Sequence, residues 1–102
     1  MNKQYPETPD SWEVLEEDER HSTISYFKGG YISGDIEIDI WRGTDVCNSV
    51  AYLTSHTREE VPDWANYIIE VSEDEELVEE LFAETDVGAW IKAKRKANEI
   101  KQ

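Results

Sequence analysis

Carboxylates alternate with isoleucines in one short segment of this chain. Residues 35–41 run acid, Ile, acid, Ile, acid, Ile, Trp. In a β-strand this alternation places Asp35, Glu37 and Asp39 on one face together with Trp41, about 6.6 Å apart along the strand. That spacing is of the same order as the spacing of phosphates along a nucleic acid. The pattern therefore predicts either a face that binds a positively charged partner or the charged solvent face of a one-sided sheet.

A second concentration of acid lies at residues 73–76. Ser72 precedes Glu75 by three positions, a capping-box spacing that predicts a helix from Ser72 to about Glu84. Glu76, Glu80 and Glu84 would then form a ridge of like charges at i, i+4 and i+8, which costs stability. Either these acids have a use, or the basic last helix lies beside them and compensates their charge.

The charge of the whole chain is strongly unbalanced. It has 24 acidic and 10 basic residues in 102, a formal net charge of −14. Residues 92–102 carry five basic residues and one acidic residue, so the net charge of −18 on residues 1–91 faces a tail of +4. Self-repulsion opposes a compact state, which leaves solubility in high salt, a basic partner or bound cations as reasons for the charge. Direct nucleic-acid binding is disfavoured, because the acidic body repels phosphate and the basic tail suits a helix C-terminus.

Signals for catalysis or metal binding are weak. Cys47, His21 and His56 form no nucleophile or zinc motif, and a lone Cys in a strand is typical of a small buried hydrophobe. The acids at 35–39 lack the glycine that an EF-hand loop needs at its sixth place, where Ile40 stands. The sequence therefore predicts no enzyme, no cofactor and no metal site.

The surrounding elements predict one α+β domain spanning residues 1–102. We expect a small antiparallel sheet of three to four strands, followed by two to three helices packed on one face. Residues 1–10 are expected to be a flexible lead-in, and Trp64 and Trp90 core anchors. The expected elements are a helix at 11–20, strands at 22–27, from 31 and at 35–41 with Gly29-Gly30 as a hairpin turn, a turn at 42–45, a strand at 46–53, a helix at 63–71 (or a strand at 67–71), and helices at 72–84 and from 87 to near the end.

In size and charge the chain is similar to the small acidic proteins that phages and mobile elements use against host defences, including anti-restriction and anti-CRISPR proteins. The resemblance is one of composition, with no family motif. It implies a non-enzymatic nucleic-acid mimic that occludes the basic surface of a partner such as a nuclease, in the cytoplasm (the host's, if the chain is viral) and without a membrane. The alternative is a soluble adaptor or toxin-neutralising immunity protein whose charge serves solubility. The residues expected to contact the partner are Asp35, Glu37, Asp39, Trp41, Glu73, Glu76, Glu80 and Glu84.

Overall fold

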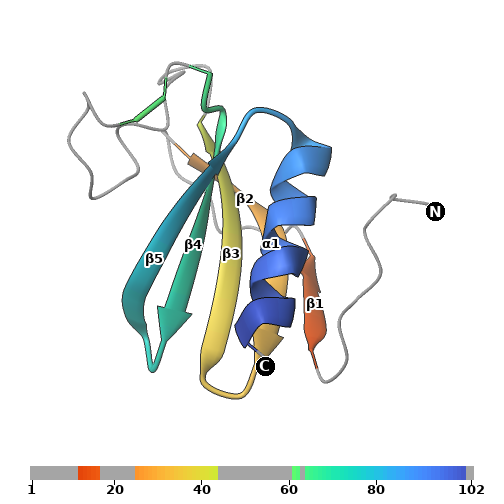
Figure 1. Cartoon of the computed structure of the whole chain (residues 1–102), viewed down its shortest axis with the longest axis vertical. Coiled ribbons are helices and arrows are strands. Elements are labelled where there is room, and N and C mark those ends of the chain that lie inside the picture. Colours follow the sequence, from red (N-terminus) through yellow and green to blue (C-terminus); the bar gives the residue numbers. More distant parts are fainter. Residues whose placement is uncertain (1–11, 17–24, 44–60, 63, 101–102) are drawn as a thin grey trace.

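The chain folds into an antiparallel sheet with a helix across one face (Figure 1). The computed structural model describes residues 12–16, 25–43, 61–62 and 64–100. Within these residues the strands follow one another in the sheet in chain order, as a meander. The elements are β1 (Glu13–Glu16), β2 (Ser25–Ser33), β3 (Ile36–Gly43), β4 (Tyr67–Glu73), β5 (Glu76–Ala83) and α1 (Asp86–Ile100).

The expected numbers of strands and helices were wrong. The described residues form five strands rather than three or four, and α1 is their only helix. The segments expected to be helical at 63–71 and 72–84 contain β4 and β5, so the strand alternative at 67–71 was the correct one. The helix expected at 11–20 is also wrong, since Glu13–Glu16 pair with β2 as a strand.

Leucine, glutamate and alanine favour helices, but pairing in a sheet can override that preference. The sequence of β5 favours a helix, yet the whole segment is a strand. It pairs with β4 from Tyr67↔Ala83 to Glu73↔Glu76.

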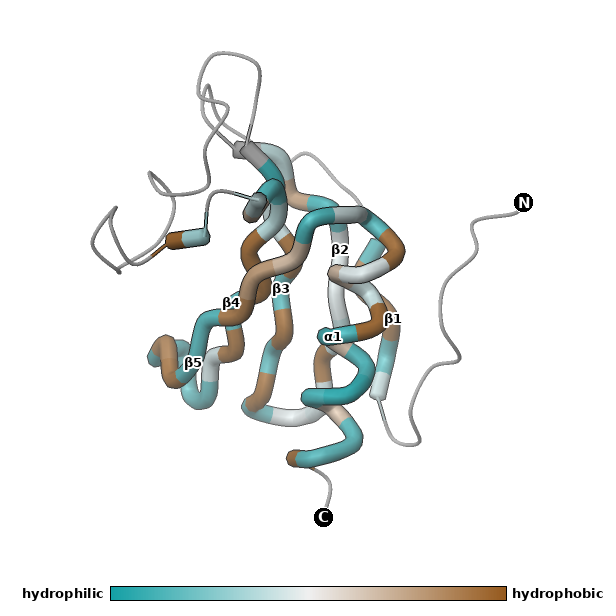
Figure 2. The backbone as a smooth tube through the Cα atoms, turned by 45° about the horizontal axis from the view of Figure 1, so that its top comes forward, coloured by the Kyte–Doolittle hydropathy of each residue, from teal (hydrophilic) through white to brown (hydrophobic). Residues whose placement is uncertain are grey.

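The alternation predicted for residues 35–41 is present in β3, and its hydropathy can be followed along the strand in Figure 2. Ile38 and Ile40 are fully buried on the face covered by α1. Ile69 and Val71 of β4 join them there, and Trp90 of α1 packs on the same cluster. The main core therefore lies between the sheet and the helix, and the other members of each alternating strand face away from it.

Trp90 needs glycine beneath it. A Cβ on Gly29 would lie 2.9 Å from the Trp90 ring and 2.5 Å from the Leu15 carbonyl oxygen. Gly29 also has φ +121°, a conformation that other residues avoid. Trp90 is 3% exposed and meets Tyr31 edge to face at 5.5 Å, as expected for a core anchor. Gly29 is thus a seat for the helix, and since Gly29 and Gly30 both lie inside β2, the hairpin turn expected there was wrong.

Two short turns close the hairpins at one end of the sheet. Gly34 and Asp35 connect β2 to β3, and Gly34 has the positive φ of +60° that such a turn requires. Asp74 and Glu75 connect β4 to β5 with φ of 55° and 68°, although neither is glycine. The Asp74 N–H donates to the Asp35 carbonyl at 2.9 Å, so the two turns are bonded to each other.

The last helix begins where the sequence predicts. Thr85 caps it, since its side-chain oxygen accepts from the Gly88 N–H at 3.0 Å and its carbonyl accepts from the Ala89 N–H. Ala89, Ala93 and Ala97 are buried against the sheet. These small residues let the helix backbone approach the strands closely.

Several expectations fall on other parts of the chain. The lead-in at 1–10, the strand at 46–53, and Cys47 with both histidines lie outside the described residues. The turn expected at 42–45 lies only partly within them, and its first two residues belong to β3. No helix among the described residues has the length and apolar character to cross a membrane.

Gly29→Ala should destabilise the fold, because the added methyl meets both Trp90 and the Leu15 carbonyl. We expect a loss of about 2–4 kcal/mol, combining overpacking with the strained φ. Gly34→Ala is the matched control: its Cβ would meet nothing within 4 Å, so only the φ of +60° costs energy, about 1 kcal/mol. Urea unfolding measures both, and equal losses would show that Trp90 does not press on Gly29.

Candidate functional site

The carboxylates of β3 project from the sheet face opposite α1. Glu37, Asp39 and Trp41 share this face, because the alternate residues Ile38 and Ile40 are buried under the helix. Asp35 lies just before the strand, in the turn. The common face predicted for these residues is therefore confirmed for Glu37, Asp39 and Trp41.

Acids of three neighbouring strands face one another across this surface. Asp39 of β3 lies opposite Glu70 of β4, and Glu70 lies opposite Glu80 of β5. Like charges placed directly opposite in a sheet are destabilising, by up to about 1 kcal/mol per pair. We call the surface formed by Glu37, Asp39, Glu70 and Glu80 the acidic face.

Glu70 was not among the residues predicted to contact a partner. Its segment was expected to be helical, with a strand as the alternative, and only the register of β4 places it between two other carboxylates. A strand pattern at 67–71 was the one signal in the sequence that could have found it.

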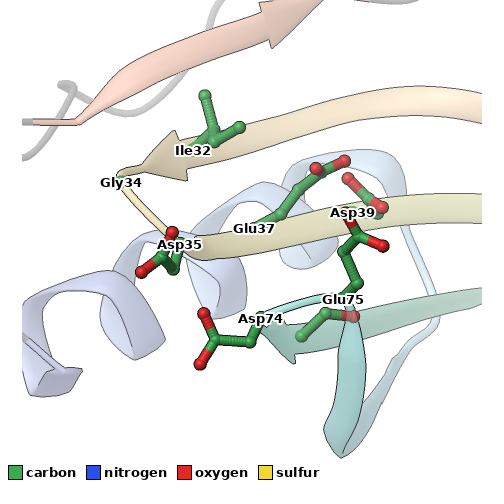
Figure 3. Close-up of a pocket in the computed structure, with 8 residues that line it drawn as sticks. Ile32, Gly34, Asp35, Glu37, Asp39, Asp74 and Glu75 are labelled. Atoms are coloured by element: carbon green, nitrogen blue, oxygen red, sulfur yellow. The ribbon is translucent and has the colours of Figure 1, made fainter.

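A hollow of about 470 Å³ lies at the turn end of the acidic face (Figure 3). The described residues that line it include five carboxylates and no basic side chain. Because the two turns are bonded to each other, carboxylates of two separate hairpins, β2–β3 and β4–β5, meet here. The lining residues are Ile32, Gly34, Asp35, Glu37, Asp39, Ser72, Asp74 and Glu75.

Burial and a neighbouring charge both act on the carboxyl group of Glu70. Partial burial raises the pKa of its carboxyl, and the neighbouring Glu80 carboxylate raises it further. The side chain of Trp41 acts in the opposite direction and lowers the pKa in part. Glu70 therefore ionises at a cost that a nearby cation would relieve.

The other end of the same sheet face is apolar. Trp41 meets Phe27 edge to face at 5.2 Å and packs beside Ile68 and Phe82. Val61 and Ala65 complete this second cluster. Trp41 is therefore half-buried next to the carboxylates, between an apolar patch and a charged one.

The ridge expected from Glu76, Glu80 and Glu84 does not exist, because these residues are not helical. A bulge in β5 changes the register between Val71 and Ser72, which places Glu76 opposite Glu73 and Glu80 opposite Glu70. Glu73 and Ile69 have the same parity in β4, so Glu73 and Glu76 belong to the helix side and Glu80 to the acidic face. Glu84 follows the strand and is exposed.

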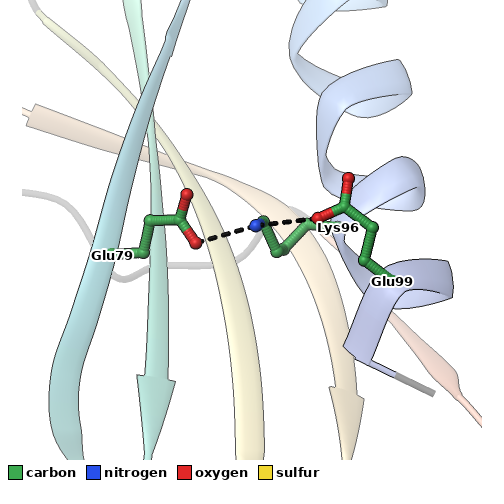
Figure 4. A network of polar contacts seen from close by, with 3 residues as sticks. All are labelled: Glu79, Lys96 and Glu99. Atoms are coloured by element: carbon green, nitrogen blue, oxygen red, sulfur yellow. Dashed lines mark hydrogen bonds and ion pairs between the residues drawn. The ribbon is translucent and has the colours of Figure 1, made fainter. Parts of the chain in front are cut away.

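The basic helix does compensate acid, but on its own side of the sheet. Lys96 bridges Glu79 of β5 at 2.8 Å and Glu99 of α1 at 3.0 Å (Figure 4). These two hydrogen-bonded carboxylates raise the pKa of Lys96. Lys92 donates to the Phe82 carbonyl, and its Nζ lies 5.5 Å from the ring centre of Trp64. Trp64 itself is 49% exposed, so the core position expected for it was wrong.

The geometry does not assemble a metal centre from the described residues. Among them, no group of three or more His, Cys, Asp or Glu side chains could hold an ion. The carboxylates are spread across three strands and two turns rather than converging on a point. Such an array suits a charged surface that meets another charged surface.

No protein-family model, no curated protein and no solved structure matches this chain. A function has therefore to be inferred from the geometry and charge of the molecule itself. The acidic face and the hollow are the features that combine both.

Glu70→Gln should stabilise the protein at pH 7 and lose that effect in acid. With its pKa raised in the folded state, Glu70 carries no penalty below the usual glutamate value of 4.5 and destabilises the fold as the pH rises through its folded pKa. Since the site is partly solvated, we expect a gain of about a few tenths of a kcal/mol at neutral pH.

Urea unfolding of the wild type and of Glu70→Gln, from below the usual glutamate pKa up to pH 7, checks the expectation. Glu13→Gln removes the same charge from an exposed position on β1 and is the control. If the gain in unfolding free energy is the same at every pH, or equal in Glu70→Gln and Glu13→Gln, then ionisation of Glu70 does not destabilise the fold.

Proposed function

We propose that this chain is a non-enzymatic binding protein whose acidic face occludes the basic, nucleic-acid-binding surface of a partner protein. The observation that carries the proposal is the row Asp39, Glu70 and Glu80, where acids of three neighbouring strands lie directly opposite one another. The row lowers stability, and within it the Glu80 carboxylate adds to the effect of burial, which is the larger one, in raising the pKa of Glu70. A cationic partner would offset the repulsion between these carboxylates on binding, whereas the fold alone gains nothing from it.

The dimensions of the surface support a nucleic-acid mimic. Same-face residues are about 6.6 Å apart along a strand and neighbouring strands are about 4.8 Å apart, so the carboxylates form a two-dimensional array. A partner groove that binds phosphates with Lys and Arg can pair with such an array and release the same counterions. The apolar patch around Trp41 adds the aromatic anchor that is typical of interface hot spots.

The proposed partner is a basic effector such as a nuclease, a restriction enzyme or an RNA-guided complex, met in the cytoplasm. An adaptor or immunity protein whose charge only provides solubility remains the second candidate. A net charge of −14 would serve that purpose without any pattern. The patterned row is the reason to prefer occlusion.

Reversing charge at the hollow should abolish capture of a basic partner. The test variant is Asp35→Lys/Glu37→Lys/Asp39→Lys, and the control Glu16→Lys/Glu84→Lys/Asp86→Lys makes the same change in net charge at exposed positions outside the hollow. Immobilised wild type and control should capture nucleic-acid-binding proteins from a bacterial lysate at low salt. The test variant should capture at least about tenfold less, since several ion pairs are lost.

Added duplex DNA and high salt should both release the captured proteins, because they compete for the same basic groove. Circular dichroism must show that each variant is folded. Capture that survives the reversal removes the acidic face from the mechanism, and failure of the wild type to capture any basic protein favours the solubility alternative.

A further inference from the structure

β5 is the last strand of the sheet as far as the described residues extend, and it lies at the margin of the molecule in Figure 1. Edge strands present backbone groups that can pair with another chain, and proteins commonly block them with lysine, proline or a covering element. The sequence of β5, ELVEELFA, contains neither lysine nor proline. Within the strand the edge is protected by its bulge, between Val71 and Ser72 in the β4 register, and by its three glutamates, which repel acidic segments but not basic ones.

One end of this edge is closed from outside the strand. Lys92 of α1 reaches the Phe82 carbonyl and lies over Trp64, so a helix lysine covers the Ala83 end of β5. The opposite end carries exposed apolar side chains instead. Leu77 is 42% exposed and Val78 is 56% exposed.

A second hollow of about 280 Å³ lies directly beside this uncovered end. Aliphatic side chains from β3, β4, β5 and the end of α1 form much of its lining, and three carboxylates with Lys96 form the rest. It is large enough to take an aliphatic side chain of an incoming segment. The lining residues are Ile36, Val71, Glu73, Val78, Glu79, Lys96, Glu99 and Ile100.

We propose that the 76–81 part of β5 binds an extended segment of a partner in which basic and aliphatic residues alternate. The segment would add a strand to the sheet, place an aliphatic side chain in the second hollow, and set its basic side chains against the glutamates of β5. Strand addition takes affinity from backbone pairing and specificity from pockets for alternate side chains. This surface shares Glu80 with the acidic face, but it does not depend on the function proposed for that face.

Charge decides between the possible occupants. β5 carries Glu76, Glu79 and Glu80 and no basic residue. A second copy of the chain would bring β5 glutamates against each other, in a molecule whose net charge is already −14. A basic segment gains from the same charges, so we assign the edge to a partner and not to self-association.

Binding of a defined peptide tests the proposal. The probe is a synthetic peptide that alternates lysine and valine, titrated into the ¹⁵N-labelled full chain, with an alternating glutamate–valine peptide for comparison. We expect shifts and slowed amide exchange at residues 77–81 with the basic peptide and neither with the acidic one. Shifts confined to Glu37 and Asp39, without slowed exchange in β5, would overturn the proposal.

Val78→Lys supplies the mutational arm, and Val87→Lys is its matched control. Both valines are 56% exposed, and both variants gain one positive charge, but Val87 lies in the first turn of α1. Val78→Lys should weaken the basic peptide by about tenfold, because it removes an apolar contact and adds a like charge. Leu77→Lys should do the same if Val78→Lys does not fold.

Equal weakening by Val87→Lys would overturn the proposal, as would dimers of the wild type in light scattering that disappear on Val78→Lys. In the Asp35→Lys/Glu37→Lys/Asp39→Lys background the β5 shifts should persist. Loss of binding at the β5 edge can therefore be distinguished from loss of binding at the acidic face.

Discussion

The packing of Trp90 onto Gly29 is the contact on which the rest of the structure depends. It seats α1 against the sheet and, with Tyr31, forms the centre of the main core. Because one helix suffices to cover one face, each alternating strand can bury its apolar residues there and leave its other residues to the opposite side. The acidic face exists because of this division: its carboxylates lie on one side of the sheet, and the main apolar core lies on the other.

The carboxylates lower the stability of the sheet that carries them. Acid faces acid from β3 through β4 to β5, and again at the end of the β4–β5 hairpin, where Glu73 meets Glu76. The turn between them holds Asp74 and Glu75 at positive φ; Asp tolerates this conformation, but the second position usually takes Gly rather than Glu. Several unfavourable choices thus coincide at one end of the molecule, next to the acid-lined hollow, and such local conflicts are typical of functional surfaces.

How far the sequence predicts this molecule depends on the range of the forces involved. The alternation in β3 and the start of the last helix are local signals, and both were interpreted correctly from neighbouring residues alone. β5 could not be predicted in the same way, since Ser72 and Glu75 mimic a capping box and ELVEELFA repeats its glutamates at helical spacing. Its strand conformation comes from pairing with β4, and the meeting of Asp39, Glu70 and Glu80 follows from that register. Trp64 was misplaced for the same reason, because its helix was inferred and does not form.

The separation of charge between the two layers gives the molecule an electric dipole as well as a net charge. α1 carries four basic and two acidic residues, whereas carboxylates dominate the far side of the sheet. In the field of a cationic surface such a body experiences a torque, which turns its sheet side forward before contact. A uniformly acidic protein of the same net charge would arrive just as often but in random orientations. The helix lysines would then raise the fraction of encounters that are productive without touching the partner.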